Sequence, residues 1–284
     1  MKNRAAFNLV ELSIVITVFS LLLIAIGSGT KLIRQAKVKS AERITDTSPV
    51  WEIVNDELER SVVAWFDALD RDSMDLLSGT TTNEITNWRS KVNVGKYFTA
   101  TQSTTDEYPK YSRDGMDNFP AVLFDGTDDS FTVPTPLRTG DTTVSFAVAF
   151  YSTSTDAGVI FNQGASTTAA ATSYSLAPDL ETSFLVNDAG ADAANLSTNR
   201  IHAVVLTVDG DDVSAYVNNE AVDTGTLGTS VVLANDVATI GSDSAASPVY
   251  FNGYLGELII FDKVLTSSEV TLMTEYLTTK YRIK

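Results

Sequence analysis

The stretch Val144-Ser145-Phe146-Ala147-Val148-Ala149-Phe150-Tyr151 decides the fold of this chain. Every second residue from Val144 to Phe150 is large and apolar, and smaller or more polar residues stand between them. Successive side chains of a β-strand point to opposite faces, so a period of two places these apolar side chains on one face. The stretch therefore predicts a strand with one strongly apolar face.

Further strands are predicted on the C-terminal side of this stretch. Residues 201–208 and 213–217 flank Asp209-Gly210, a dipeptide that favours a tight β-hairpin. Residues 255–262 form one more apolar run. Several strands separated by turn residues, with few helical patterns, are typical of a β-sandwich rather than of alternating strands and helices.

Ordered blocks within residues 62–281 resemble the concanavalin A-like (laminin-G-like) jelly-roll family. The sharpest block, residues 119–129, ends in Asp125-Gly126-Thr127-Asp128-Asp129. The resemblance implies a jelly-roll sandwich and places Trp65, Trp88 and His202 in its core.

The N-terminal part of the chain differs from the rest in charge and hydropathy. Residues 1–44 carry seven basic and two acidic side chains, a net charge of +5, whereas residues 45–284 have a net charge of −21. Eighteen uncharged residues run from Leu12 to Gly29, directly after Glu11. A helix over residues 7–29 would be about 35 Å long, which is enough to cross a bilayer. The pattern predicts a membrane-spanning helix that continues as a stem to residue 44.

Three interpretations of this segment stay open from the residues alone. A secretory signal peptide fits the basic start and the small residues Gly27-Ser28-Gly29, although its apolar stretch is normally shorter. A plain membrane anchor explains the length, but Glu11 at membrane depth would cost about 2.5–3.5 kcal/mol. In the third interpretation the chain is cut between Ala6 and Phe7, before the apolar stretch.

The third interpretation rests on a second resemblance. A short basic start that ends in Ala6, followed by Phe7-Asn8-Leu9-Val10-Glu11, is similar to the cleavage and methylation motif of type IV prepilins and pseudopilins. The resemblance implies processing at Ala6 and Phe7 by a prepilin peptidase, and assembly in which Glu11 pairs with the Phe7 ammonium of a neighbouring subunit. It also implies an inner-membrane assembly platform, a single-pass form in the inner membrane and, after assembly, an extracellular filament.

Two local signals predict where helices end and begin. The segment Thr45-Asp46-Thr47-Ser48-Pro49 should end the stem helix, because a residue before proline is disfavoured in the α conformation. Near the C-terminus, Thr266-Ser267-Ser268-Glu269 predicts a capping box that opens a short last helix.

Composition excludes several kinds of chemistry. The chain has no cysteine and one histidine, which excludes disulfides, thiol nucleophiles and multi-histidine metal sites. A net charge of −16 opposes nucleic-acid binding. The nearest match to the acidic signature of jelly-roll glucanases, Asp56-Glu57-Leu58-Glu59, lies in the predicted connector rather than on a strand. We therefore predict no catalytic residue and a protein that is not an enzyme.

The acidic turn offers a candidate metal site. Asp125, Asp128 and Asp129 supply carboxylate oxygens, which Ca²⁺ prefers. Acidic turns also occur without an ion, because aspartate favours turn geometry. We predict that no cofactor is required, with calcium as the candidate ion at these three residues. The sequence names no ligand-binding residue in the sandwich.

The predicted fold class is α+β, with a long N-terminal transmembrane and stem helix, a concanavalin A-like jelly roll and a short C-terminal helix. The predicted divisions are a leader (1–6), the helix (7–44), a connector (45–61) and the sandwich (62–284). The predicted function is a structural subunit of a type IV pilus-like filament, made of identical or other pilin subunits. Two alternatives stay open: an adhesive minor pilin that binds surface glycans, and a pseudopilin of a type II secretion system.

Overall fold

The computed structural model describes residues 9–55, 61–79, 81–93, 97–133, 143–155, 158–164, 174–179, 183–186, 189–192, 196–218, 220–226, 237–243 and 247–283. In parts of these ranges, among them residues 9–12, 14 and 21–28, only the backbone is described.

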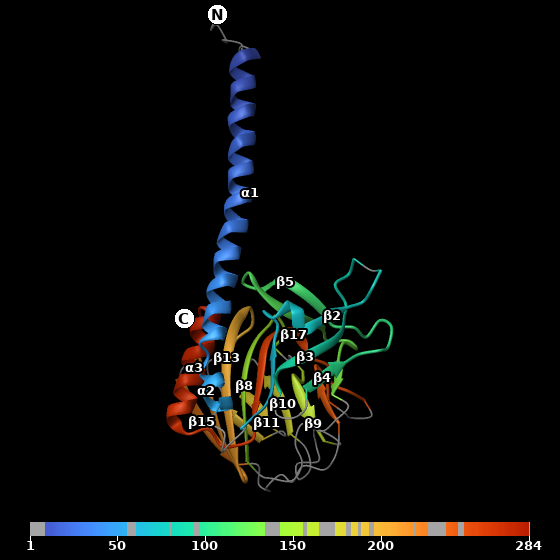
Figure 1. Cartoon of the computed structure of the whole chain (residues 1–284), viewed down its shortest axis with the longest axis vertical. Helices are drawn as coiled ribbons and strands as arrows, with labels where there is room; N and C mark the ends of the chain where they lie inside the picture. The colour runs from blue at the N-terminus through green and yellow to red at the C-terminus, as the bar shows by residue number, and fades with distance from the viewer. Residues whose placement is uncertain are drawn as a thin grey trace, which may run out of the picture.

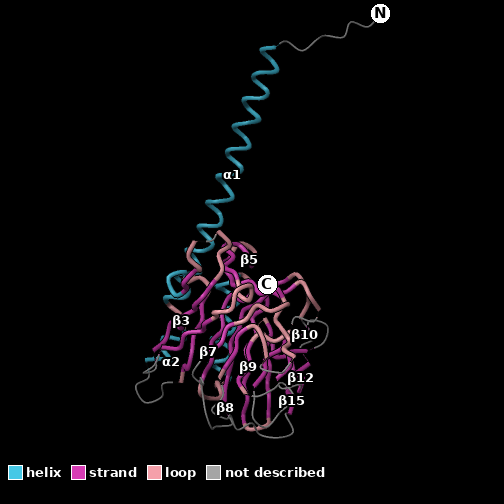
Figure 2. The backbone as a smooth tube through the Cα atoms, turned by 90° about the vertical axis from the view of Figure 1, so that its right-hand side faces the viewer, coloured by secondary structure: helices cyan, strands magenta, loops and turns pink. Residues whose placement is uncertain are grey.

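Three layers form the body of the molecule: a layer of helices, a sheet beneath it and a second sheet beneath that (Figure 1, Figure 2). The helices are α1 (Leu9–Asp46), α2 (Pro49–Asn55) and α3 (Ser267–Tyr281), with a short 3₁₀ helix η1 (Arg71–Ser73). The N-terminal part of α1 projects far beyond the sandwich (Figure 1). We call residues 9–33 the projecting segment and residues 34–46 the base of α1.

The sheet under the helices, sheet 1, has eight antiparallel strands among the residues that the structure describes. Their order is β15 (Glu220–Thr226), β14 (Asp212–Val217), β13 (Arg200–Asp209), β8 (Thr143–Ser152), β17 (Asn252–Phe261), β6 (Phe119–Asp125) and β5 (Lys110–Met116), and β1 (Val62–Asp67) pairs with β17.

The second sheet, sheet 2, has nine strands in the described part of the chain, and all except β3 have six residues or fewer. Their order is β12 (Ala189–Asp192), β11 (Ser183–Val186), β10 (Tyr174–Asp179), β9 (Phe161–Gln163), β16 (Ala238–Ile240), β7 (Phe131–Val133), β4 (Tyr97–Thr101), β3 (Ile85–Asn93) and β2 (Met74–Leu76).

Strand β8 confirms the alternation read from the sequence and adds a feature to it. Phe146 and Phe150 enter the core between the two sheets. Ala147 and Ala149, on the opposite face, are also fully buried, because that face packs under the helices. Small side chains there let a helix approach the sheet closely, so both faces of the strand are buried.

The local signals for turns and helix ends are confirmed. Strands β13 and β14 form the expected hairpin, but its two turn residues are Gly210 and Asp211, because Asp209 still pairs with Asp212. Helix α1 ends at Asp46 and α2 begins at Pro49. Thr266 and Glu269 form both halves of the capping box at the start of α3. Trp65, Trp88 and His202 are fully buried, as the jelly-roll resemblance implied.

The membrane-spanning part of the predicted fold class is wrong. Within the described part of the chain, no helix combines the length and the apolar character needed to cross a membrane. Polar residues such as Thr17 and Ser20 interrupt the described apolar side chains of α1, and charged residues recur from Lys31 onward. This finding also overturns the predicted single-pass inner-membrane location that preceded the extracellular filament.

Candidate functional site

The residues predicted for processing lie largely outside the described part of the chain. Ala6 and Phe7 are not among the described residues, and Glu11 lies in α1 without a described side chain. Cleavage at Phe7 and the pairing of Phe7 with Glu11 therefore stay predictions.

The projecting segment carries large apolar side chains on its surface. Phe19 is 61% exposed and Ile33 is 63% exposed. Four further large apolar side chains of the segment are about half exposed or more: Val15, Ile16, Val18 and Leu32. The backbone of the segment stands clear of the sandwich in both views (Figure 1, Figure 2), and these side chains are exposed within the described part of the chain.

The base of α1, in contrast, is fixed to the sandwich. Lys37 Nζ lies 3.0 Å from a carboxylate oxygen of Asp117 in the β5–β6 turn and also donates to the backbone carbonyl of that residue. Ala41 is fully buried in the core under the helices. In α2, the ring centroid of Trp51 lies 4.9 Å from the ring centroid of Trp65 on β1. The projecting segment thus leaves the sandwich from a packed base.

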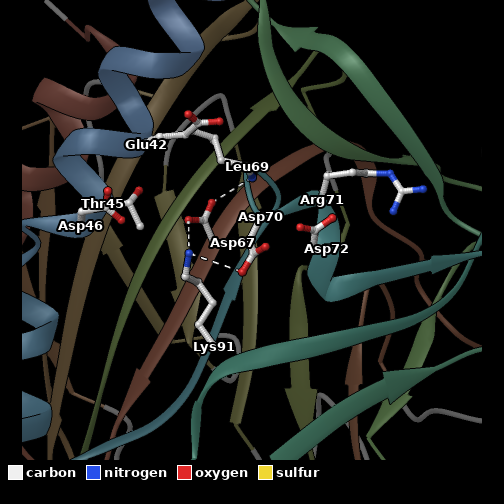
Figure 3. Close-up of a pocket in the computed structure, with 9 residues that line it drawn as sticks. All are labelled: Glu42, Thr45, Asp46, Asp67, Leu69, Asp70, Arg71, Asp72 and Lys91. Atoms are coloured by element: carbon white, nitrogen blue, oxygen red, sulfur yellow. Dashed lines mark hydrogen bonds and ion pairs between the residues drawn. The ribbon is translucent and has the colours of Figure 1, made fainter.

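A polar pocket of about 410 Å³ lies where the base of α1 meets the sandwich (Figure 3). Lys91 sits within it, with Nζ 3.5 Å from carboxylate oxygens of both Asp67 and Asp70. The backbone N–H of Leu69 donates to Asp67 over 2.9 Å. The remaining lining residues are Glu42, Thr45, Asp46, Arg71 and Asp72. Five carboxylates against two cations make this pocket suited to positively charged groups rather than to anions.

A fully buried ionic cluster lies beneath α3, next to this pocket. Lys280 Nζ is 3.0 Å from Asp67 Oδ2 and 2.7 Å from Glu257 Oε2, and all three side chains have no exposed surface. Tyr276 and Trp65 each donate a hydrogen bond to Glu257 Oε1, over 2.7 and 2.6 Å. The cluster joins α3 to β1 and β17.

The two carboxylates of the cluster have different pKa values. Burial opposes ionisation of Asp67, but Lys280 and Lys91 outweigh it and lower the pKa of that carboxyl. Burial, reinforced by the charge of Asp67, raises the pKa of Glu257 despite its contact with Lys280. Asp67 is therefore the carboxylate whose ionised form the lysines favour, while Lys280 contacts both carboxylates.

The structure brings the predicted metal ligands Asp125, Asp128 and Asp129 together. One carboxylate oxygen from each lies within 4.8 Å of the others. Asp129 is buried and accepts a hydrogen bond from the backbone N–H of Asp125 over 3.0 Å, and Asp125 accepts one from the backbone N–H of Thr127 over 2.8 Å. Burial, together with the charge of Asp125, raises the pKa of Asp129 to about 7.

This donor set fits calcium in part. Three carboxylates supply oxygen ligands of the kind that Ca²⁺ prefers, but the ion takes six to eight in all. Water or backbone carbonyls would have to supply the others, and two carboxylates already accept backbone hydrogen bonds. Calcium binding by this turn stays a prediction.

His202 has a structural environment. Its Nε2 lies 2.8 Å from the backbone oxygen of Ser197, and its Nδ1 lies 3.2 Å from the side-chain amide of Asn218. Burial lowers the pKa of the imidazole, which favours its neutral form. The side chain thus ties β13 to the segments beside it.

Sequence reasoning missed the ionic cluster and the pocket beside it. One signal was present: Asp67 and Glu257 each stand within an otherwise apolar strand segment, where an isolated carboxylate would be costly. The sequence around these two carboxylates did not indicate their partner, because Lys280 lies on α3, 213 positions after Asp67.

Similar solved structures share the sandwich. Domain 4 of AbnA, an extracellular arabinanase from Geobacillus stearothermophilus, is 18% identical, with a TM-score of 0.50 over 75% of this chain and 98% of that domain. Two structures of a GH54 α-L-arabinofuranosidase are 12% and 11% identical, each with a TM-score of 0.54, over 70% and 81% of this chain. The chain spans only 51% and 65% of those two enzyme chains. No curated protein matches the sequence.

These likenesses overturn the prediction that the chain is not an enzyme, because the similar structures are glycoside hydrolases or a domain of one. At 11–18% identity they show the fold alone, so they assign no reaction to this chain. Residues 125–271, more than half of the sequence, match the family described as the concanavalin A-like lectin/glucanases superfamily. The chain belongs to the concanavalin A-like lectin/glucanases superfamily.

Proposed function

We propose that this chain polymerises through α1 into a filament similar to a type IV pilus, with the sandwich carried on the outside. The observation that carries the proposal is the uncovered apolar surface of the projecting segment. Burying a large apolar side chain contributes about 1.5–3 kcal/mol. Six such side chains therefore provide a strong drive for the segment to pack against other chains.

The distribution of these side chains favours a polymer over a dimer. At 100° per residue, their six positions, from Val15 to Ile33, spread over about 200° of the helix surface. An apolar stripe of about 100° is enough for contact with one neighbouring surface. The wider spread provides for several neighbouring helices, as in the core of a filament.

The prepilin-like residues support the same function from the sequence. The motif from Ala6 to Glu11 is similar to one that directs cleavage and assembly in type IV prepilins. In the proposed filament, Glu11 of one subunit offsets the Phe7 ammonium of the next. A prepilin peptidase and further pilin subunits are the partners that this proposal requires.

Substitutions in the projecting segment test the proposal. Phe19→Glu should abolish filaments seen by electron microscopy, because it places a carboxylate in the apolar contact, and Glu11→Gln should reduce their yield sharply. Removing one partner of a buried ion pair costs about 3–5 kcal/mol. The matched control is Leu272→Glu on α3, which changes a side chain that is 47% exposed but lies outside the segment. The absence of filaments from the wild-type chain, or a normal yield from Phe19→Glu, would contradict the proposal.

A glycan-binding, adhesive subunit is the second candidate. It is favoured by the likeness to arabinanase domain 4, which was solved in complex with arabinotriose. Adhesion and polymerisation are compatible, because they use different parts of the chain. Binding of the full chain to an array of polysaccharides, compared with binding to the same surface without polysaccharide, tests this candidate separately from filament formation.

A further inference from the structure

A second cavity, of about 360 Å³, lies on the helix-covered side of sheet 1. Four segments far apart in the sequence form it: the β5–β6 turn with Asp117, the end of β8 with Tyr151, the start of β13 with Arg200, and the end of α3 with Arg282. Its volume falls within the range of small-molecule sites in proteins. It shares no lining residue with the polar pocket at the base of α1.

This cavity is locally positive in a chain that is strongly negative. Arg200 and Arg282 are both exposed, and no carboxylate among the described residues lies within 4.0 Å of either guanidinium. The carboxylate of the lining residue Asp117 is already paired with Lys37 at 3.0 Å. Two arginines therefore line the cavity without an ion-paired carboxylate among the described residues, in a protein with a net charge of −16.

The ring of Tyr151 also lines the cavity, and two neighbouring side chains contact this residue. Tyr151 is half-buried, and its ring packs against that of Tyr254 with 5.9 Å between the centroids. The phenol hydroxyl of Tyr151 donates to Asn199 Oδ1 over 3.4 Å. Ile283 adds half-buried apolar surface. Apolar surface with a few convergent polar groups is the usual composition of a ligand site.

The backbone at Arg282 adds an independent observation. Arg282 has φ = 55° and ψ = 39°, the left-handed conformation. Its N–H donates to the carbonyl of Thr279, and the N–H of Ile283 donates to that of Thr278, so α3 ends in a Schellman motif. Glycine is the favoured residue at this position, since other side chains are strained there. Strained backbone conformations cluster at functional sites, and Arg282 combines such a conformation with a place in the lining of the cavity.

We propose that this cavity binds a carboxylated sugar of the uronic acid type. Arg200 and Arg282 hold the carboxylate, because a guanidinium presents paired donors that match its two oxygens. The ring of Tyr151 contacts the apolar face of the sugar ring, and the amide of Asn199 reaches its hydroxyl groups. The inference deepens the second candidate function, because it names a site and a ligand class for glycan binding.

Titration calorimetry of the full chain tests the proposal with three probes: glucuronate, glucose and acetate. Glucuronate should bind at least tenfold more tightly than glucose, which lacks the carboxylate, and than acetate, which lacks the sugar ring. Arg282→Gly and Arg200→Gln should each weaken glucuronate binding at least tenfold. Arg113→Gln is the matched control, since it removes an exposed arginine from β5 outside the cavity and should leave binding unchanged.

Arg282→Gly separates loss of binding from loss of folding. Glycine suits the left-handed position, so the variant should unfold at the same temperature as the wild type or higher. Equal affinity for glucuronate and glucose, or for glucuronate and acetate, would overturn the proposal, as would unchanged binding by Arg282→Gly. If the chain binds neutral glycans and none of the cavity variants alters that binding, the second candidate function stands and this site is wrong.

Discussion

The protonation of Asp129, in the acidic turn, depends on the fold. Its raised pKa of about 7 means that the folded chain holds a proton that the unfolded chain releases above a pH of about 4. The stabilising effect of this proton is complete below that pH and is lost as the pH rises toward 7. The loss reaches at most about 1.4 kcal/mol per pH unit.

Asp129→Asn should flatten this part of the pH dependence. We expect the free energy of unfolding, measured with urea at several pH values from 4.5 to 7.5, to fall less steeply in the variant than in the wild type, because asparagine does not titrate. Asp128→Asn, at a less buried position of the same turn, serves as the control. Identical slopes for wild type and Asp129→Asn would contradict the assignment. If the turn binds calcium, millimolar Ca²⁺ should stabilise the wild type at pH 7.5 and leave Asp129→Asn unaffected.

Lys280 should be among the residues least tolerant of substitution. Lys280→Met leaves Glu257 buried without its cation and leaves Asp67 with Lys91 alone, and removing one member of a buried ionic cluster costs about 3–5 kcal/mol. The control is Lys263→Met, which breaks a partly exposed pair with Glu269 and should cost about 1 kcal/mol or less. Urea unfolding measures both.

A second substitution shows whether the cost comes from uncompensated charge. Adding Asp67→Asn to Lys280→Met removes the carboxylate with the lowered pKa, so part of the lost stability should return. If Lys280→Met and Lys263→Met have equal effects, the buried cluster contributes no more than a surface pair.

At the scale of elements, local patterns predicted structure well where the determining residues are close in sequence. The alternation in β8, the β13–β14 hairpin and the capping box of α3 each depend on residues only a few positions apart. The alternation could not show that the second face of β8 is buried, since α3 lies more than 100 residues further along the chain. The apolar run after Glu11 predicted a helix correctly but not its environment.

The same distinction explains what was predicted of the candidate sites. Asp125, Asp128 and Asp129 lie within five residues, so their grouping was visible in the sequence. The cluster of Asp67, Glu257 and Lys280 joins residues 213 positions apart, and no local signal connects them. The cavity with Arg200 and Arg282 likewise exists only once four separate segments have packed together.

At the scale of the molecule, the base of α1 belongs to the folded body rather than to a linker. We expect a fragment of residues 34–284 to be more stable than one of residues 45–284 by about 2 kcal/mol or more, because the longer fragment keeps the buried Ala41 and the half-buried Ile44. The longer fragment also keeps the contact between Lys37 and Asp117. Thermal and urea unfolding of the two fragments measure the difference. Equal stabilities would show that the base of α1 only rests on the sandwich.

The packed base of α1 has a mechanical consequence. A pulling force along the projecting segment enters the body through the base of α1 and α2, and the chain then passes into β1, which pairs with β17 inside sheet 1. Tension therefore acts first on side-chain contacts, such as those of Lys37 and Trp51, and then on the ladder of hydrogen bonds between β1 and β17. Separating the sandwich from the projecting segment requires the contacts of the base of α1 and α2 to break before the β1–β17 ladder is loaded, which gives the junction a resistance to pulling that a flexible tether would lack.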